Sequence, residues 1–123
     1  MAERVLQIDA GRHQIFRPQA GVTLRLLHAG SGYQAFLIDV ESGTSCQSSP
    51  HDGQELRYVV SGTVVFSVAG DEHVVGAGGT LHHRSSVPHG FRTEDQPACF
   101  VTFALSRDYD IRRLLRGLAE GES

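Results

Sequence analysis

Glycine spacing is the feature of this sequence that most constrains its fold. Fourteen glycines divide the 123 residues into short segments, most of which are rich in β-branched and aromatic residues. Short strands with turns at intervals of roughly 8–12 residues are typical of an all-β sandwich or barrel. Strands do not alternate with helices, which excludes a parallel α/β sheet. The predicted strands are Val5–Asp9, His13–Arg17, Val22–His28, Tyr33–Val40, Glu55–Val60, Val64–Ala69, Glu72–Val75, Thr80–Arg84, Gly90–Thr93 and Ala98–Leu105.

One segment near the end of the chain departs from this pattern. Its apolar residues follow the i, i+3, i+4, i+7 spacing of a helix face, which predicts a short C-terminal helix over about 108–118. We therefore expect a single domain over 1–123, with a barrel over about 5–105. The apolar stripe could cover the barrel of the same chain or contact a second subunit. It consists of Ile111, Leu114, Leu115 and Leu118.

Charge and composition exclude several classes of function. The formal net charge is −3 and the sequence pI is about 6.1, so no basic field exists to attract nucleic acid or an anionic membrane. No apolar run approaches the ~18–20 residues needed to cross a bilayer. The first residues lack the pattern of a secretory signal, so we expect a cytoplasmic protein. Cys46 and Cys99 are expected to be reduced thiols rather than a disulfide.

Histidine is the residue type that carries most of the candidate chemistry. Five of the seven histidines lie between His51 and His89. Glu55 follows His51 by four residues and begins an apolar strand, while His89 begins a later strand. In a closed small barrel these three side chains could meet in the lumen. Two imidazoles and one carboxylate would suit Fe(II), Mn(II), Co(II), Ni(II) or Zn(II), and would leave coordination positions open.

The arrangement of these residues resembles the two sequence motifs of the cupin superfamily. His51-x₃-Glu55-x₆-Gly62 is similar to the second half of the first motif, His-x-His-x₃₋₄-Glu-x₆-Gly. Gly79-x₈-Pro88-His89-x₃-Thr93 is similar to the second motif. The resemblance implies an all-β, RmlC-like jelly-roll barrel in a small single-domain cupin. It also implies one divalent metal ion, Fe(II) being favoured, bound by His51, Glu55 and His89.

This sequence departs from the cupin pattern at three positions. Ser49 stands where the first histidine of the family is found, and Thr80 and Thr93 replace an aspartate and an asparagine. The change at Ser49 reduces the usual four ligands to a triad. A water molecule or the hydroxyl of Ser49 could take the vacant position, or the chain could have kept the barrel without the metal.

Arg57 and a pair of adjacent histidines are the other candidate site residues. Arg57 lies two residues after Glu55 and is expected on the same strand face, where a guanidinium needs an anion. That anion could be a substrate carboxylate or phosphate, or Glu55 itself, unless a bulge turns Arg57 outward. Of His82 and His83, at most one can face the lumen, where it could be a fourth ligand or a general base. We take Arg57 and His83 as candidate catalytic residues.

Aromatic residues complete the predicted interior. Phe91 shares a strand face with His89 and is expected to form an apolar wall beside a ligand. Four further phenylalanines are predicted in the core of the barrel, and they are Phe36, Phe66, Phe100 and Phe103.

Together these features predict a metal-dependent enzyme acting on a small, anionic organic molecule. Dioxygenase or other oxidoreductase chemistry at iron is slightly favoured over lyase or isomerase chemistry. The alternative is a non-catalytic cupin that binds or senses a small molecule. We expect no nucleic-acid or membrane partner, and a homodimer because sheet edges and the terminal helix could pair between copies.

Overall fold

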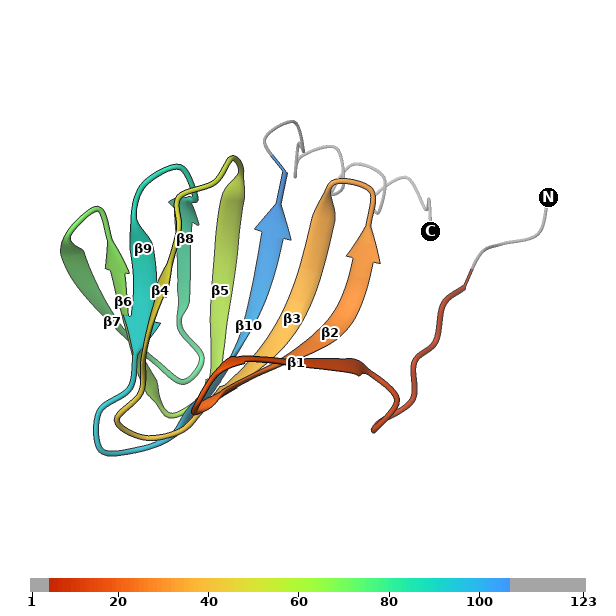
Figure 1. Cartoon of the computed structure of the whole chain (residues 1–123), viewed down its shortest axis with the longest axis horizontal. Coiled ribbons are helices and arrows are strands. Elements are labelled where there is room, and N and C mark those ends of the chain that lie inside the picture. The colour runs from red at the N-terminus through yellow and green to blue at the C-terminus, as the bar shows by residue number, and fades with distance from the viewer. Residues whose placement is uncertain (1–4, 107–123) are drawn as a thin grey trace.

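The computed structural model of the chain describes residues 5–106, and these residues form two antiparallel β-sheets (Figure 1). The larger sheet has the strand order β1-β2-β3-β10-β5-β8. It consists of β1 (Gln14–Gln19), β2 (Val22–Gly30), β3 (Tyr33–Val40), β10 (Ala98–Leu105), β5 (Gln54–Ser61) and β8 (Thr80–Arg84). The smaller sheet has the order β4-β9-β6-β7. It consists of β4 (Ser45–Ser48), β9 (His89–Arg92), β6 (Thr63–Val68) and β7 (Asp71–Gly76).

Alternation along the strands determines which side chains face the interior between the sheets. On β5, Glu55, Arg57 and Val59 are buried, whereas Tyr58 and Val60 are exposed. This is the period of two expected of a strand with one buried face. The alternation of β5 therefore places the carboxylate of Glu55 and the guanidinium of Arg57 together inside the sandwich.

The core is a contiguous group of valine, isoleucine and phenylalanine side chains from both sheets. Phe66 and Phe100 are fully buried and pack edge to face, with 5.2 Å between ring centroids. Phe91 packs against Phe100 in the same manner at 5.1 Å. Such pairs add roughly 0.5–1.5 kcal/mol beyond their burial. Two of these rings, Phe66 and Phe100, also lie against the guanidinium of Arg57 on β5.

The all-β expectation is confirmed, and three details of it are wrong. Val5–Asp9 is not a strand, because no neighbouring strand pairs with it and Val5 and Leu6 are exposed. The strand β4 was not predicted, since its serine- and glutamine-rich sequence has little β-propensity. Phe103 points away from the core and is 41% exposed. Its register opposite Ala35 and Leu56 places it on the outer face of the larger sheet.

Two further expectations concern a C-terminal helix and the state of the two cysteines. The predicted helix over 108–118 lies outside the described residues. Both cysteines are free thiols in the described structure, Cys46 on β4 and Cys99 on β10. Among the described residues, no helix is long and apolar enough to cross a membrane.

Candidate metal centre

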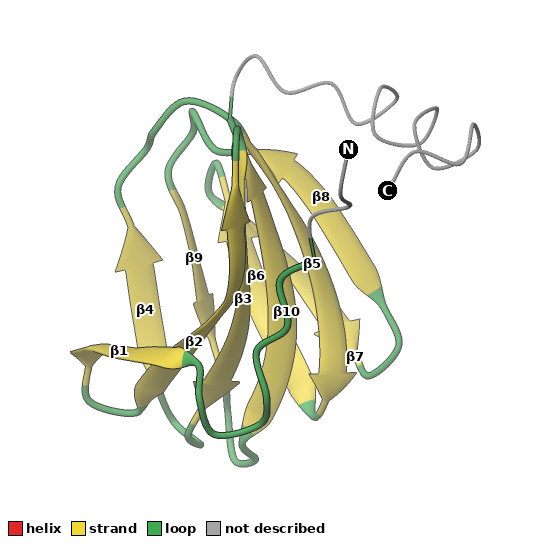
Figure 2. Cartoon of the chain, turned by 90° about the vertical axis from the view of Figure 1, so that its right-hand side faces the viewer, coloured by secondary structure: helices red, strands yellow, loops and turns green. Residues whose placement is uncertain are grey.

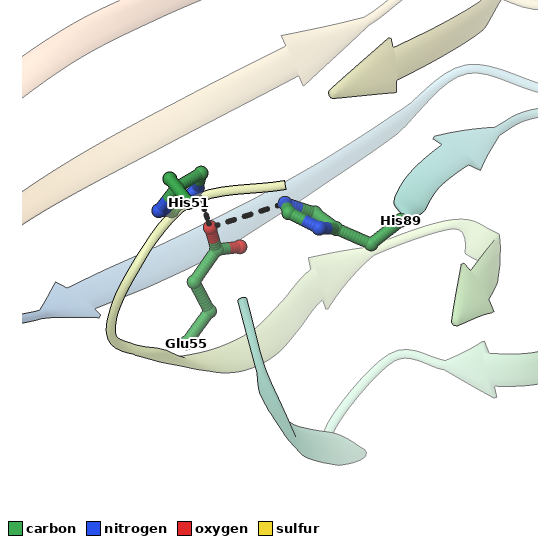
Figure 3. A group of neighbouring side chains, drawn as sticks. All are labelled: His51, Glu55 and His89. Atoms are coloured by element: carbon green, nitrogen blue, oxygen red, sulfur yellow. Dashed lines mark ion pairs between the residues drawn. The ribbon is translucent and has the colours of Figure 1, made fainter. Parts of the chain in front are cut away.

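Three side chains from separate segments converge at one end of the sandwich (Figure 3). His51 lies in the turn between β4 and β5, Glu55 lies on β5, and His89 is the first residue of β9. The Oε1 atom of Glu55 is 3.2 Å from Nε2 of His51 and 3.5 Å from Nε2 of His89. One ligand atom from each residue lies within 4.8 Å of the other two. A single cation could therefore contact all three residues.

Backbone carbonyl groups fix the orientation of the imidazoles. Nδ1 of His89 lies 2.8 Å from the carbonyl oxygen of Val87, and Nδ1 of His51 lies 3.2 Å from that of Asp52. Because a carbonyl oxygen can only accept, each Nδ1 carries a proton, and Nε2 is the ring atom directed at Glu55; in the neutral imidazole this atom has the lone pair that a cation would bind. Metal-binding histidines are commonly held in this way.

The Nε2 atom of His89 shows most directly that a cation would fit. His89 is 1% exposed, and its Nε2 atom has no hydrogen-bond partner. A buried polar atom without a partner costs about 1–3 kcal/mol. A cation beside Oε1 of Glu55 would satisfy this lone pair, so the donor set suits a divalent metal ion.

Backbone contacts hold the two ligand-bearing segments together. The amide of His51 donates to the carbonyl oxygen of Ser85 at 2.9 Å, and the amide of Ser85 donates to that of Gly53 at the same distance. Gly53 has a φ of +117°, and a Cβ atom there would lie 2.2 Å from the carbonyl oxygen of Leu105. Only glycine fits this turn, which brings His51 back over Glu55.

Arg57 lies directly behind Glu55 and is 4% exposed. Its Nη2 group forms an ion pair with Oε2 of Glu55, which is the oxygen that does not contact the two histidines. Its Nη1 group donates to Oγ1 of Thr102 at 3.2 Å. The guanidinium also lies 5.4 Å from the ring centroid of Phe66 and 5.8 Å from that of Phe100. Burial lowers the pKa of Arg57, and the neighbouring Glu55 opposes that shift.

His83 is the inward member of the adjacent histidine pair. It is 7% exposed, whereas His82 is exposed and contacts Oε1 of Gln54 at 2.6 Å. Nδ1 of His83 lies 2.9 Å from the carbonyl oxygen of Arg84, so Nε2 is the acceptor for Nη2 of Arg57 at 3.2 Å. Burial lowers the pKa of His83, and the hydrogen bond to the Arg84 carbonyl partly offsets this.

Two hollows must be distinguished by their distance from these residues. One of about 720 Å³ is lined mainly by residues of β1, β2 and β3, including Arg17, Arg25 and Asp39, and none of its lining residues belongs to the candidate centre. A smaller one of about 340 Å³ is lined by His51, together with Tyr33 and other residues around the β2–β3 turn. The smaller hollow is the relevant one, because it reaches a residue of the centre and His51 is half exposed. A small molecule could approach the centre from that side.

The structure thus brings together all five site residues considered from the sequence, which are His51, Glu55, His89, Arg57 and His83. The three residues that depart from the cupin motifs lie outside the group formed by these five side chains. Ser49 and Thr80 are exposed, and buried Thr93 donates to the carbonyl oxygen of Glu41 at 2.5 Å. Phe91, expected as a ligand wall, is 6% exposed and packs in the core.

Thr102 is the site-adjacent residue that was not anticipated from the sequence. It is buried on β10 and accepts a hydrogen bond from Arg57. Alternation with Phe100 could have placed it inside, but only the β10–β5 register, which sets Thr102 opposite Arg57, identifies its partner.

Comparison with known proteins identifies the family. The model of the cupin domain family matches residues 36–104, which is more than half of the chain. The protein therefore belongs to the cupin family, and its two sheets form the cupin jelly roll. None of the curated proteins matches the sequence significantly.

Solved structures at low identity share this fold. An RmlC-like cupin from Shewanella frigidimarina aligns with a TM-score of 0.71 at 22% identity, over 85% of this chain and 95% of that one. The cupin domain of an XRE family transcriptional regulator from Enterobacter cloacae aligns with a TM-score of 0.66 at 19% identity, over 69% and 96%. Hydroxypropylphosphonic acid epoxidase from S. wedmorenis aligns with a TM-score of 0.72 at 16% identity, over 81% and 59%. HppE in the Fe(II) form gives 0.77 at 15% identity, over 85% and 62%.

Proposed function

We propose that this cupin is a metal-dependent enzyme that acts on a small, anionic organic molecule. His51, Glu55 and His89 would hold one divalent metal ion. The observation that carries this proposal is the buried Nε2 atom of His89, which has no hydrogen-bond partner and lies 3.5 Å from Oε1 of Glu55. A purely structural histidine at this depth would be expected to have both ring nitrogens satisfied.

Iron(II) is the metal that we favour, with zinc, manganese, nickel and cobalt as alternatives. Two imidazoles and one carboxylate with open positions form the ligand set of non-heme iron oxygenases. The fold is also shared with an Fe(II) protein, HppE, at low identity. When bound, iron would supply a redox centre on which a substrate and dioxygen could meet, whereas zinc or manganese would supply a Lewis acid for lyase or isomerase chemistry. We place oxygenase chemistry slightly ahead.

Arg57 and His83 are the residues that we assign to the chemistry around this centre. Arg57 holds Oε2 of Glu55, so that Oε1 remains directed at the two histidines. Burial lowers the pKa of His83, which favours the neutral imidazole, and its Nε2 atom, which accepts a hydrogen bond from Arg57, is the atom that would have to take up a proton. We therefore propose Arg57 as a residue that positions Glu55 and His83 as a general base.

Elemental analysis of protein purified without added metal tests the proposal. We expect close to one first-row metal ion per chain in the wild type, and a loss of most of it in His51→Ala and Glu55→Ala. His73→Ala is the matched control, because His73 is exposed and lies outside the centre. The metal centre is wrong if the wild type carries no more metal than the two site variants.

A second candidate function is the binding or sensing of a small molecule without catalysis. The similarity to the cupin domain of a transcriptional regulator favours it. The two candidates differ in one measurement on the Fe(II)-loaded protein. An oxygenase consumes dioxygen only when its substrate is present, whereas a sensor binds the molecule without oxygen uptake.

We also infer that the protein forms a homodimer. The strand β1 lies at the edge of the larger sheet, and all six of its residues are exposed. Among them, the apolar Ile15 and Phe16 are 38% and 41% exposed. Such an edge is a template for pairing with a second copy. Light scattering should give twice the mass of the chain, and Phe16→Lys should shift the mass towards the monomer.

A further inference from the structure

Inside the sandwich, the buried charges next to the proposed metal centre cancel each other. Among the described residues, Glu55 and Arg57 are the two buried side chains that carry a full charge. They form an ion pair with each other, so their charges cancel. His51 and His89 are neutral when their Nδ1 atoms donate to carbonyl groups and their Nε2 atoms bind a cation.

The ion pair would persist when a metal is bound, because the two oxygens of Glu55 have separate partners. Oε1 faces the two histidines, and Oε2 faces Arg57. In Figure 3 both dashed contacts end on the same carboxylate oxygen, and the second oxygen takes part in neither. A cation between Oε1 and the imidazoles therefore does not need to displace Arg57.

Several contacts also hold the guanidinium of Arg57 in place. Nη2 contacts Glu55 and Nε2 of His83, and Nη1 donates to Thr102. The guanidinium lies over the rings of Phe66 and Phe100 as well. It can therefore act on a ligand of the metal through its charge, without contacting that ligand.

We infer that the ligand of this centre is a small organic dianion that binds through two oxygen atoms, such as a dicarboxylate or a related chelate. The inference rests on the proposed metal centre. An unpaired carboxylate would reduce the charge of a divalent site to +1, but here Arg57 has already neutralised Glu55. The centre keeps a charge of +2 in a partly buried place, where an uncompensated charge is costly. A dianion restores neutrality, and the positions left open by three protein ligands allow it to chelate.

Three molecules of the same shape and different charge test this inference. Oxalate, oxamate and oxamide carry two, one and no negative charges. Each is titrated into the Co(II)-loaded protein, and binding is followed by the visible absorption of cobalt. For the wild type we expect oxalate to bind most tightly, oxamate more weakly and oxamide not measurably. In Arg57→Met the preference for oxalate over oxamate should fall by about tenfold or more, because one positive charge near the centre is lost.

Matched variants separate charge from shape. Arg57→Lys keeps the charge and should retain the preference of the wild type. Arg92→Gln removes a partly exposed arginine that pairs with Glu72, outside the centre, and should not change the preference. Thermal melting followed by circular dichroism verifies that each variant is folded, and Arg57→Gln replaces Arg57→Met if the latter does not fold.

The metal content after gel filtration distinguishes the two ways in which the experiment could fail. If the wild type does not retain cobalt, the proposed metal centre is wrong and the inference falls with it. If the wild type retains cobalt and the ratio of oxalate to oxamate affinity is the same in the wild type and in the neutral variant, the inference about the dianion alone is overturned.

Discussion

Glu55 and His83 stand directly opposite each other on β5 and β8, and Oε2 of Glu55 lies 3.7 Å from Nε2 of His83. This distance is too long for a hydrogen bond. Arg57 contacts both atoms and links them. His83 therefore lies on the side of Oε2, away from the oxygen that faces His51 and His89, and we expect it to lie outside the ligand set.

Replacing His83 should leave the metal in place. We expect His83→Ala to bind one ion per chain, with an affinity lowered by about 10–100-fold at most, as for a residue that supports the ligands without being one of them. His82→Ala is the control, because His82 is exposed on the same strand. Isothermal titration with Zn(II) measures both affinities. A complete loss of binding in His83→Ala alone would make His83 a fourth ligand.

Breaking the buried ion pair should destabilise the fold strongly. Glu55→Gln leaves the guanidinium of Arg57 buried without its anion, and we expect the free energy of unfolding to fall by about 3–5 kcal/mol. Glu72→Gln, which removes an exposed partner of Arg92, should cost less than about 1 kcal/mol.

Urea unfolding of the metal-free proteins measures these changes. The double variant Glu55→Gln/Arg57→Met should lose less stability than the sum of the two single variants, because the second change removes the orphaned charge. Additive losses would show that the two side chains do not stabilise each other.

The turn that carries His51 should not tolerate a side chain at Gly53. In Gly53→Ala the φ of +117° is strained and the new Cβ meets the carbonyl oxygen of Leu105, so we expect a loss of about 2 kcal/mol or more. Gly43→Ala has a positive φ of 67° but open space around it, and should cost only about 1 kcal/mol. Urea unfolding of both variants makes the comparison, and equal losses would argue against a close contact at Gly53.

Cys99 should react slowly with alkylating agents at neutral pH. Burial, followed by the carboxylate of Asp39, raises the pKa of Cys99 to about 11. Only the thiolate reacts, so the rate with iodoacetamide should rise as the pH increases towards 11. The experiment uses Cys46→Ser so that one thiol remains. Asp39→Asn should lower the pKa of Cys99 and speed the reaction at pH 8, and a wild-type midpoint near 8.5, as in a free thiol, would contradict the expectation.

The sequence and the structure differ most where a position depends on pairing between distant strands. The His51–Glu55 spacing and His89 after a proline could be recognised as a motif, and the alternation of β5 placed Arg57 beside Glu55. Which of two adjacent histidines faces inward could not be decided locally. The β5–β8 register decides it, by setting His83 opposite Glu55.

Two errors have the same physical origin. The short strand β4 has little β-propensity of its own and forms because β9 offers it a partner. Phe103 was predicted to lie in the core because its side chain is apolar, yet the register of β10 turns it outward. Composition describes what a side chain prefers, whereas strand pairing determines where that side chain lies.

Two of the proposed ligands, Glu55 and His89, lie on different sheets, and a bound ion would therefore affect the motions of the molecule. Glu55 belongs to the larger sheet and His89 to the smaller one, and the two sheets face each other in Figure 2. An ion held between them would cross-link the two sheets at one end of the sandwich. Each opening of the sheets at that end would first require release of the ion, so opening becomes rarer as the free ion concentration rises above its dissociation constant. The rate of hydrogen exchange at the amides around His89 would then fall as the concentration of the free metal ion rises.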